Sequence, residues 1–253
     1  MAIDEHLTEH ARGAMIGLAI GDALGMPTQS MSAERIIECY GGPVRRLMDA
    51  VPQQPIAPNM KAGSVTDDTE QAFVLAARLI EDHGRIDNDA YAQDLLRWEA
   101  KMKEKGSLDL LGPSTKAALQ ALVEGVDPEL TGRFGTTNGG AMRATPVGIA
   151  FIPGNALAEA AWRSCVVTHN TMQGIESPTL AAAAVSLVIV NEARRLGVPN
   201  DKLVKMLVNV GFDTVAGSVP VLGDVFDVYF KSNRRNFNLV MDHFGLDHTD
   251  LDR

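Results

Sequence analysis

Residues 66–80 read TDDTEQAFVLAARLI, and this stretch decides the fold class. Its apolar residues recur three and four positions apart, which is the period of one helix face. The residues on that face are Ala72, Phe73, Ala76, Leu79 and Ile80. Asp67 and Glu70 have the spacing of a capping box, so the acidic cluster is expected at the N-terminus of this helix.

The same helical pattern continues on both sides of this stretch, whereas alternating strand patterns are hard to find. Helices are predicted at 5–25, 87–104, 114–124, 155–169, 177–196 and 201–210, with a weaker one from 218 onward. Pro178 would open the helix at 177–196. Residues 26–65 carry many prolines and are predicted to form one long loop. We therefore expect a single all-α domain over residues 1–253.

The predicted helix at 5–25 carries a glycine at every fourth position. Gly13, Gly17, Gly21 and Gly25 would form one slowly turning stripe along it. Glycine has no side chain, so the stripe predicts close packing of a second helix.

Composition and charge exclude some classes of function. The formal net charge of −9 argues against binding of nucleic acid through its phosphates. Two cysteines, Cys39 and Cys165, give no disulfide framework, and the N-terminus shows no signal-like apolar run, so a cytoplasmic protein is expected. The apolar stretch at 180–190 is too short to span a bilayer and is interpreted as a core helix, so no membrane partner is expected.

The tetrapeptide Thr66-Asp67-Asp68-Thr69 is the sharpest candidate site. Its carboxylates and hydroxyls are hard oxygen ligands, as Mg²⁺, Ca²⁺ or Mn²⁺ prefer. Helix capping is the competing explanation, because Asp and Thr are common N-caps and acidic groups there gain ~0.3–1 kcal/mol from the helix dipole. One cap needs only one such side chain, so two threonines and two aspartates exceed that need.

Three further segments could carry chemistry. Residues 136–143 read TTNGGAMR, a glycine loop running into a helix, where backbone N–H groups could cradle an anion and Arg143 could pair with a phosphate or a carboxylate. A plain turn is the alternative. Asp22 lies at an apolar helix end and needs a partner or a metal. His169 follows an apolar run and is either a buried structural residue or, with Cys165 four residues before it, part of a nucleophile–base pair.

Together and in this order, these segments resemble the ADP-ribosylglycohydrolase family. The matching segments are GDALG at 21–25, TDDT at 66–69, NGGAMR at 138–143 and TH at 168–169. The resemblance implies an all-α, orthogonal multi-helix fold that holds two Mg²⁺ or Mn²⁺ ions. It also implies hydrolysis of an N- or O-glycosidic bond to ADP-ribose or a related ribosyl group, on an ADP-ribosylated protein or a small ribosylated molecule.

Roles follow from the resemblance, position by position. Thr66, Asp67 and Asp68 would be metal ligands, and Asp67 or Asp68 would also position the attacking water. The substrate-binding residues would be Asn138, Gly139, Gly140, Arg143 and His169.

The C-terminus departs from the family pattern, which closes the metal site with Gly-Asp-x-Asp-Thr. Residues 245–250 read GLDHTD, so Asp247 suits the first carboxylate but Thr249 stands in place of the second. The motif is therefore incomplete, and we expect a weak second metal and poor turnover. A catalytically weak or inactive ADP-ribose- or nucleotide-binding relative is thus one alternative, and a nucleoside or ribosyl hydrolase of small-molecule metabolism is another. Gln29 stands near where many members carry a Glu.

Overall fold

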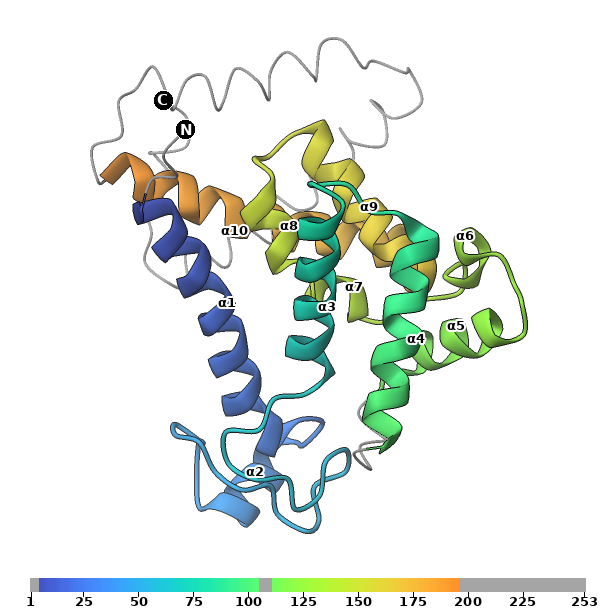
Figure 1. Cartoon of the computed structure of the whole chain (residues 1–253). Coiled ribbons are helices and arrows are strands. Elements are labelled where there is room, and N and C mark those ends of the chain that lie inside the picture. Colours follow the sequence, from blue (N-terminus) through green and yellow to red (C-terminus); the bar gives the residue numbers. More distant parts are fainter. Residues whose placement is uncertain (1–4, 105–110, 196–253) are drawn as a thin grey trace. The chain divides into compact units, whose positions relative to one another are not determined.

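The computed structural model describes residues 5–104 and 111–195 (Figure 1). The chain divides into two units, Met1–Val210 and Gly211–Arg253, and every described residue belongs to the first. These residues form ten α-helices and one 3-10 helix, with no strand among them, which confirms the all-α prediction. The predicted single domain over 1–253 stays a prediction. The helices expected at 201–210 and beyond 218 lie outside the described residues.

The helices follow one another along the chain with short connections, apart from the segment before α3. Their bounds are α1 Glu5–Gly25, η1 Met26–Thr28, α2 Ala33–Tyr40, α3 Asp67–Glu81, α4 Asn88–Glu104, α5 Pro113–Val123, α6 Pro128–Thr131, α7 Gly139–Met142, α8 Thr145–Ala150, α9 Asn155–His169 and α10 Met172–Arg195.

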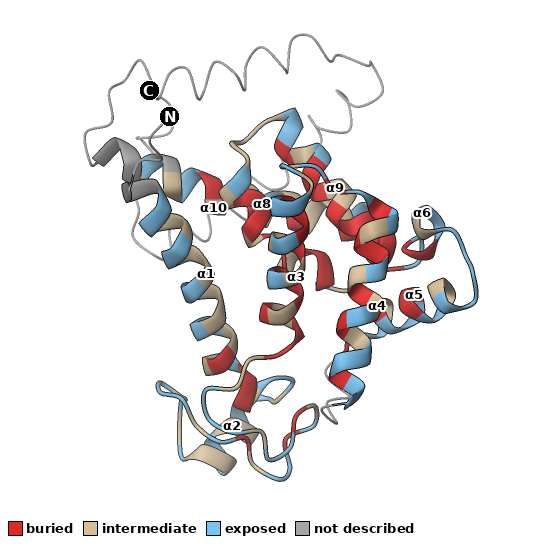
Figure 2. Cartoon of the chain, viewed as in Figure 1, coloured by how far each residue is buried: buried red, intermediate tan, exposed pale blue. Residues whose placement is uncertain are grey.

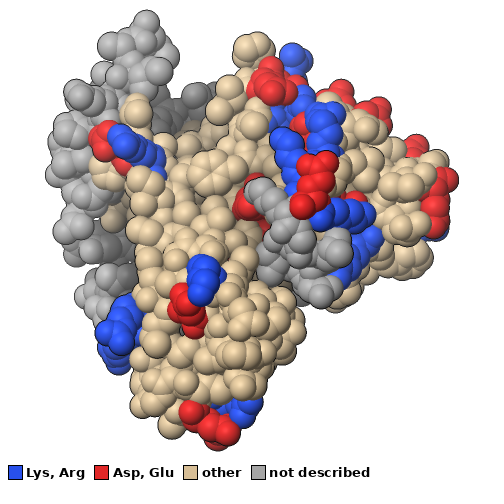
Figure 3. Space-filling model, turned by 60° about the horizontal axis from the view of Figure 1, so that its bottom comes forward, with Lys and Arg blue, Asp and Glu red and all other residues tan. Residues whose placement is uncertain are grey.

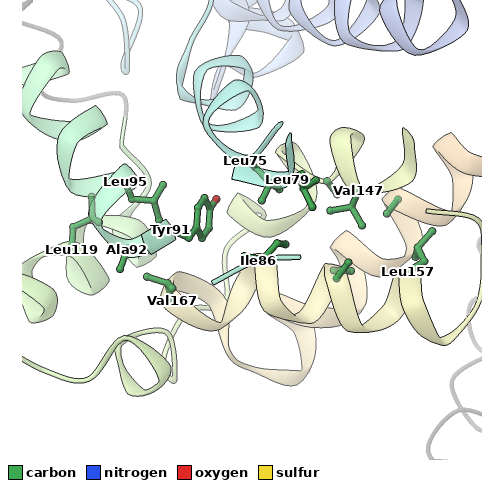
Figure 4. Close-up of a cluster of buried hydrophobic side chains, with 14 residues drawn as sticks. Leu75, Leu79, Ile86, Tyr91, Ala92, Leu95, Leu119, Val147, Leu157 and Val167 are labelled. Carbon is green, nitrogen blue, oxygen red and sulfur yellow. The ribbon is translucent and has the colours of Figure 1, made fainter. Parts of the chain in front are cut away.

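The main hydrophobic core lies between α3, α4, α5, α8, α9 and α10 (Figure 4). Leu75 and Leu79 come from α3, Tyr91 and Leu95 from α4, and all four are buried. Burying each large apolar side chain contributes ~1.5–3 kcal/mol, so this core fixes the position of α3. Figure 2 shows the same distribution, with buried residues on the inner side of α3 and along α9.

Helix α10 packs against α7, α8 and α9. It starts at Met172 and runs through Pro178, so the prediction that Pro178 opens this helix is wrong. Its window Met172–Ile189 is long and apolar enough to cross a membrane by length and composition, which the shorter stretch read from the sequence was not. A core helix of a folded protein meets the same criterion. Ser186 on α10 is buried and donates a hydrogen bond to the Phe151 carbonyl oxygen after α8, over 2.8 Å.

Residues 26–65 are not one structureless loop, because they contain the 3-10 helix η1 and the helix α2. Ser32 caps α2 by accepting a hydrogen bond from the Arg35 amide over 3.3 Å. Gly41 ends the helix in the left-handed conformation, with φ 76°. Both are standard cap residues, but the many prolines of this segment led to the prediction of a loop.

The glycine stripe of α1 does not pack against another described helix. All four glycines are exposed, and a Cβ added at any of them meets nothing within 4 Å. Helix α1 contacts α3, α8 and α10 through its other face, which includes the buried Ala23. The predicted close helix approach at this stripe is therefore wrong for the described residues.

Candidate functional site

The acidic cluster lies at the N-terminus of α3, as the sequence predicted. The cap, however, is Thr66, which has extended backbone and accepts a hydrogen bond from the Asp68 amide over 3.4 Å. The predicted capping box of Asp67 and Glu70 is wrong. Glu70 instead accepts a hydrogen bond from the Trp98 indole on α4, over 2.8 Å. Asp67 and Asp68 are thus not needed as the N-cap of α3.

Asp22, in the last turns of α1, accepts hydrogen bonds from both threonines beside the acidic pair. Its Oδ1 accepts from the Thr66 hydroxyl over 2.8 Å. Its Oδ2 accepts from the Thr66 amide at 2.7 Å, the Thr69 hydroxyl at 2.6 Å and the Thr69 amide at 3.3 Å. Asp22 therefore ties the end of α1 to the first turn of α3, which lies beside it in Figure 1. The partner that this carboxylate needed is a set of four N–H and O–H donors.

Asp67 and Asp68 remain as two adjacent carboxylates, and the charge of Arg143 lowers the pKa of Asp67 by less than burial and Asp68 raise it. Asp67 is only 5% exposed, and no Lys, Arg or His among residues 8–104 and 111–189 forms an ion pair with either residue. Burial, and then repulsion by Asp68, raises the pKa of Asp67 to about 7. Burial, and then the charge of Asp22, raises the pKa of Asp68 to about 6.

This donor set fits a hard divalent cation. Buried carboxylates are normally paired or bound to a metal, because an isolated buried charge is costly. The Thr66 hydroxyl and the two carboxylates present oxygen atoms only, the ligand type of Mg²⁺ and Mn²⁺. Within the described ranges, however, no group of three or more His, Cys, Asp and Glu residues is arranged to hold a metal. Asp247, the fourth predicted ligand, lies outside the described residues, so α3 supplies one side of such a site.

The glycines of the loop at 136–140 have a packing role. A Cβ on Gly139 would overlap the His169 ring, with Nε2 at 2.7 Å, and one on Gly140 would lie 2.9 Å from the Cys165 Sγ. Both glycines are buried, whereas Asn138, the residue before α7, is exposed. Their lack of a side chain is thus explained by contact with α9 and α10. Contact of Asn138, Gly139 and Gly140 with ADP-ribose stays a prediction.

Arg143 is fully buried and bonded to protein groups, so it does not offer its guanidinium to a phosphate as predicted. Its Nη1 donates to the Gln71 Oε1 over 2.7 Å. Its Nη2 donates to the Ser164 carbonyl oxygen over 3.0 Å and to the Thr168 hydroxyl. Gln71 in turn donates to the Asp67 Oδ2 over 3.4 Å. Arg143 therefore braces the interior behind the acidic pair.

His169 is also buried, and both its ring nitrogens are engaged. Nδ1 lies 2.8 Å from the Thr168 Oγ1, and Nε2 lies 2.9 Å from the Thr137 Oγ1 in the loop. Burial, and then the charge of Arg143, lowers the pKa of His169 to about 3, so the ring is neutral at physiological pH. In this structure His169 reaches the loop through Thr137, and its predicted direct contact with substrate stays a prediction.

The pairing of Cys165 with His169 as nucleophile and base is not supported. Cys165 is fully buried, and burial raises the pKa of its thiol. A thiol with a raised pKa is a poor nucleophile. The ring nitrogens of His169 already face the two threonine hydroxyls.

Sequence reasoning missed two residues that organise this site. Gln71 links Arg143 to Asp67, and Ser114 on α5 accepts hydrogen bonds from the amides of Thr136 and Thr137, over 3.3 and 3.4 Å. The contact of Gln71 with Arg143 and those of Ser114 join residues far apart in the chain, and no local pattern marks them. Only the position of Gln71, one turn after Asp67 on the same helix, could have indicated that they meet.

Comparison with known proteins decides the family. The model of the family described as ADP-ribosylglycohydrolase matches residues 4–231. The chain belongs to this family. An uncharacterised protein of Archaeoglobus fulgidus is 34% identical over 181 residues, covering 71% of this chain and 56% of that protein.

Two relatives with named activities also match. The ADP-ribosylarginine hydrolase Tri1 of Pseudomonas putida is 30% identical over 199 residues, covering 73% of this chain and 48% of that protein. The ADP-ribosyl-[dinitrogen reductase] glycohydrolase of Rhodospirillum rubrum is 28% identical over 164 residues, covering 64% and 52%. The chain thus spans about half the length of these curated relatives.

Proposed function

We propose that this protein is a metal-dependent hydrolase that cleaves an N- or O-glycosidic bond to ADP-ribose or a related ribosyl group. The observation that carries the proposal is the pair Asp67 and Asp68 at the start of α3, because Asp67 is buried, Asp68 is half-buried, and the pKa values of both carboxyls are raised, to about 7 and about 6. Membership of the ADP-ribosylglycohydrolase family supports the reaction class. The two relatives named for activity on ADP-ribosylarginine and ADP-ribosyl-dinitrogen reductase make an ADP-ribosylated protein the first substrate to test.

The proposal assigns a role to each of the candidate residues. Thr66, Asp67 and Asp68 would hold Mg²⁺ or Mn²⁺, which polarises bound oxygen groups and lowers the pKa of bound water. Asp67 or Asp68 would also orient that water toward the anomeric carbon of the ribose. The exposed Asn138 and the neighbouring Thr137 lie where the loop faces solvent, and they would bind the ADP-ribose.

A binding protein without turnover is the second candidate. It is favoured by the one-sided donor set, because the described residues provide ligands from the start of α3 alone. A two-metal site needs oxygens on opposite sides of a pair of ions ~3.5–4 Å apart. If Asp247 does not complete the site, the chain would bind ADP-ribose and hydrolyse little.

We also propose a cytoplasmic protein without nucleic-acid or membrane partners. On the face shown in Figure 3, basic side chains are interspersed with acidic ones, and much of the surface is uncharged. A nucleic-acid-binding face would instead gather Lys and Arg. The formal net charge of −9 agrees with this proposal.

Turnover of ADP-ribosylarginine with Mn²⁺ or with EDTA tests the proposal, with ADP-ribosylserine and free nucleosides as parallel substrates. If the protein is the proposed enzyme, we expect Mn²⁺-dependent turnover that Asp67→Asn and Asp68→Asn abolish. Binding of ADP-ribose without turnover on any substrate would favour the binding protein. Turnover of nucleosides alone would indicate a hydrolase of small-molecule metabolism. Equal activity in EDTA would refute the metal dependence.

A further inference from the structure

We propose that Asp22 is a positioning residue for the metal site: its carboxylate accepts a hydrogen bond from the Thr66 hydroxyl, so that a lone pair of the Thr66 oxygen is left for the cation. This inference rests on the proposed function, because it assigns to Asp22 a role in binding the metal at Thr66, Asp67 and Asp68. It concerns a carboxylate on a different helix, α1, which is separated from Thr66 by 44 positions in the chain.

The number of donors around Asp22 shows that it is not itself free to bind a metal. Its Oδ2 accepts three hydrogen bonds of 2.6–3.3 Å, from the amide of Thr66 and from the amide and hydroxyl of Thr69. Its Oδ1 accepts the Thr66 hydroxyl at 2.8 Å. A carboxylate has about four lone-pair sites, so these four donors occupy it.

The same bond fixes the direction of the Thr66 hydroxyl. A hydroxyl has one hydrogen to donate and two lone pairs to offer. The hydrogen points to the Asp22 Oδ1, and one lone pair faces the Asp68 amide at 3.4 Å. The second lone pair is left for a cation. A carboxylate that accepts a hydrogen bond from a metal ligand also makes the ligand oxygen more basic, as partners of metal ligands commonly do.

Asp22→Asn reverses this direction with almost no change in shape. Three donors converge on the Oδ2 position, so the amide oxygen of the new side chain belongs there. Its NH₂ group must then face Thr66 and donate to the hydroxyl. The lone pair intended for the cation is consumed, and the hydroxyl hydrogen turns away from residue 22.

Mn²⁺ affinity, measured by titration calorimetry on the full chain, is the main readout. We expect Asp22→Asn to weaken Mn²⁺ binding at least tenfold, which is about 1.4 kcal/mol. Thr69→Val is the matched structural control, because it removes one bond to the same carboxylate without touching the Thr66 hydroxyl. It should change Mn²⁺ affinity less than about threefold, while both variants lower the midpoint of urea unfolding.

Loss of a negative charge alone could weaken cation binding, and Glu70→Gln controls for it. Glu70 lies in the same turn of α3, and a glutamine there keeps an oxygen for the Trp98 indole. Equal losses of affinity in Asp22→Asn and Glu70→Gln would overturn the proposal in favour of a simple charge effect.

A double-mutant cycle completes the test, because a residue that acts through Thr66 has no effect without that hydroxyl. In a Thr66→Val background, Asp22→Asn should leave the remaining Mn²⁺ affinity unchanged. An undiminished effect of Asp22→Asn in that background would overturn the positioning role. Wild-type protein that binds no Mn²⁺ would overturn the metal site of the proposed function and this inference together. Mn²⁺ binding that Asp22→Asn leaves intact would overturn the inference alone.

Discussion

Replacement of Asp67 by asparagine should make the metal-free protein more stable near pH 8 while removing its affinity for Mn²⁺. Burial and the neighbouring Asp68 raise the pKa of Asp67 from 3.8 to about 7. A carboxylate with a raised pKa in the folded state opposes folding once it is ionised. Asparagine has nearly the same shape and no charge, so the variant avoids this cost.

The size of this stabilisation follows from the raised pKa of Asp67. About three pKa units at about 1.4 kcal/mol each give an upper value of roughly 4 kcal/mol. Losing a negative charge at the N-terminus of α3 costs ~0.3–1 kcal/mol through the helix dipole. We therefore expect Asp67→Asn to raise the free energy of unfolding by about 1–3 kcal/mol in EDTA near pH 8, a large change for a domain of this kind.

The pKa of Asp67 also determines how the effect of Asp67→Asn on stability changes with pH. Between the unfolded pKa of about 4 and the folded pKa of about 7, the native state keeps a proton that the unfolded state releases. Wild-type stability from this group thus falls as pH rises through that window, and the advantage of Asp67→Asn grows with it. Urea unfolding in EDTA at about pH 5, 6, 7 and 8 measures this difference. Destabilisation of about 1 kcal/mol, equal at every pH, would refute the reasoning and identify Asp67 as a simple N-terminal helix residue.

Three further outcomes are expected. Gly139→Ala should lower the free energy of unfolding by about 1–3 kcal/mol, because its Cβ would overlap the His169 ring. Gly13→Ala, on the open face of α1, should be neutral or stabilising by up to ~1 kcal/mol. Urea unfolding of both variants measures the difference. Arg143→Lys replaces two separate guanidinium nitrogens with one ammonium nitrogen, which cannot reach the acceptors of both Nη1 and Nη2, so it should cost about 2–4 kcal/mol in the same assay. A loss below about 0.5 kcal/mol would contradict the bracing role of Arg143. The His169 ring should stay neutral down to about pH 4 when its titration is followed by NMR. Because its pKa is lower in the folded protein than in the unfolded chain, its contribution to stability should fall as the pH drops below about 6.5. A ring that titrates near pH 6.5 would show that it is not buried as described.

Local patterns predicted the helices well where apolar spacing was strong. The predicted helix at 155–169 matches α9, and the acidic cluster lies at the start of α3 as expected. Helix α2 was missed although Ser32 and Gly41 mark its ends, because it is short and lies among prolines. Pro178 was misread because proline within a helix costs ~3 kcal/mol by itself. Packing of α10 against α7, α8 and α9 outweighs that cost.

The candidate site was predictable only where its residues are neighbours in sequence. Thr66, Asp67 and Asp68 form one tetrapeptide with Thr69, so their chemistry can be read directly. The role of Asp22 depends on where α1 ends relative to α3, which no local pattern encodes. The packing of Gly139 against the His169 ring likewise depends on how the loop meets α9. From the sequence alone, this glycine was therefore predicted to bind a ligand.

A buried chain of hydrogen bonds connects the acidic pair to the loop, and its polarity can be worked out from Arg143. The Arg143 guanidinium has only donors, so the Thr168 Oγ1 must accept from it and can direct its own hydrogen to the His169 Nδ1. A neutral ring that accepts at Nδ1 carries its hydrogen on Nε2, which then donates to the Thr137 Oγ1. In this tautomer the Thr137 hydroxyl keeps its own hydrogen for another acceptor. If the proposed ADP-ribose site is correct, an oxygen-rich ligand such as a diphosphate would accept this hydrogen, and the interior that braces Asp67 would also orient the Thr137 hydroxyl for the ligand.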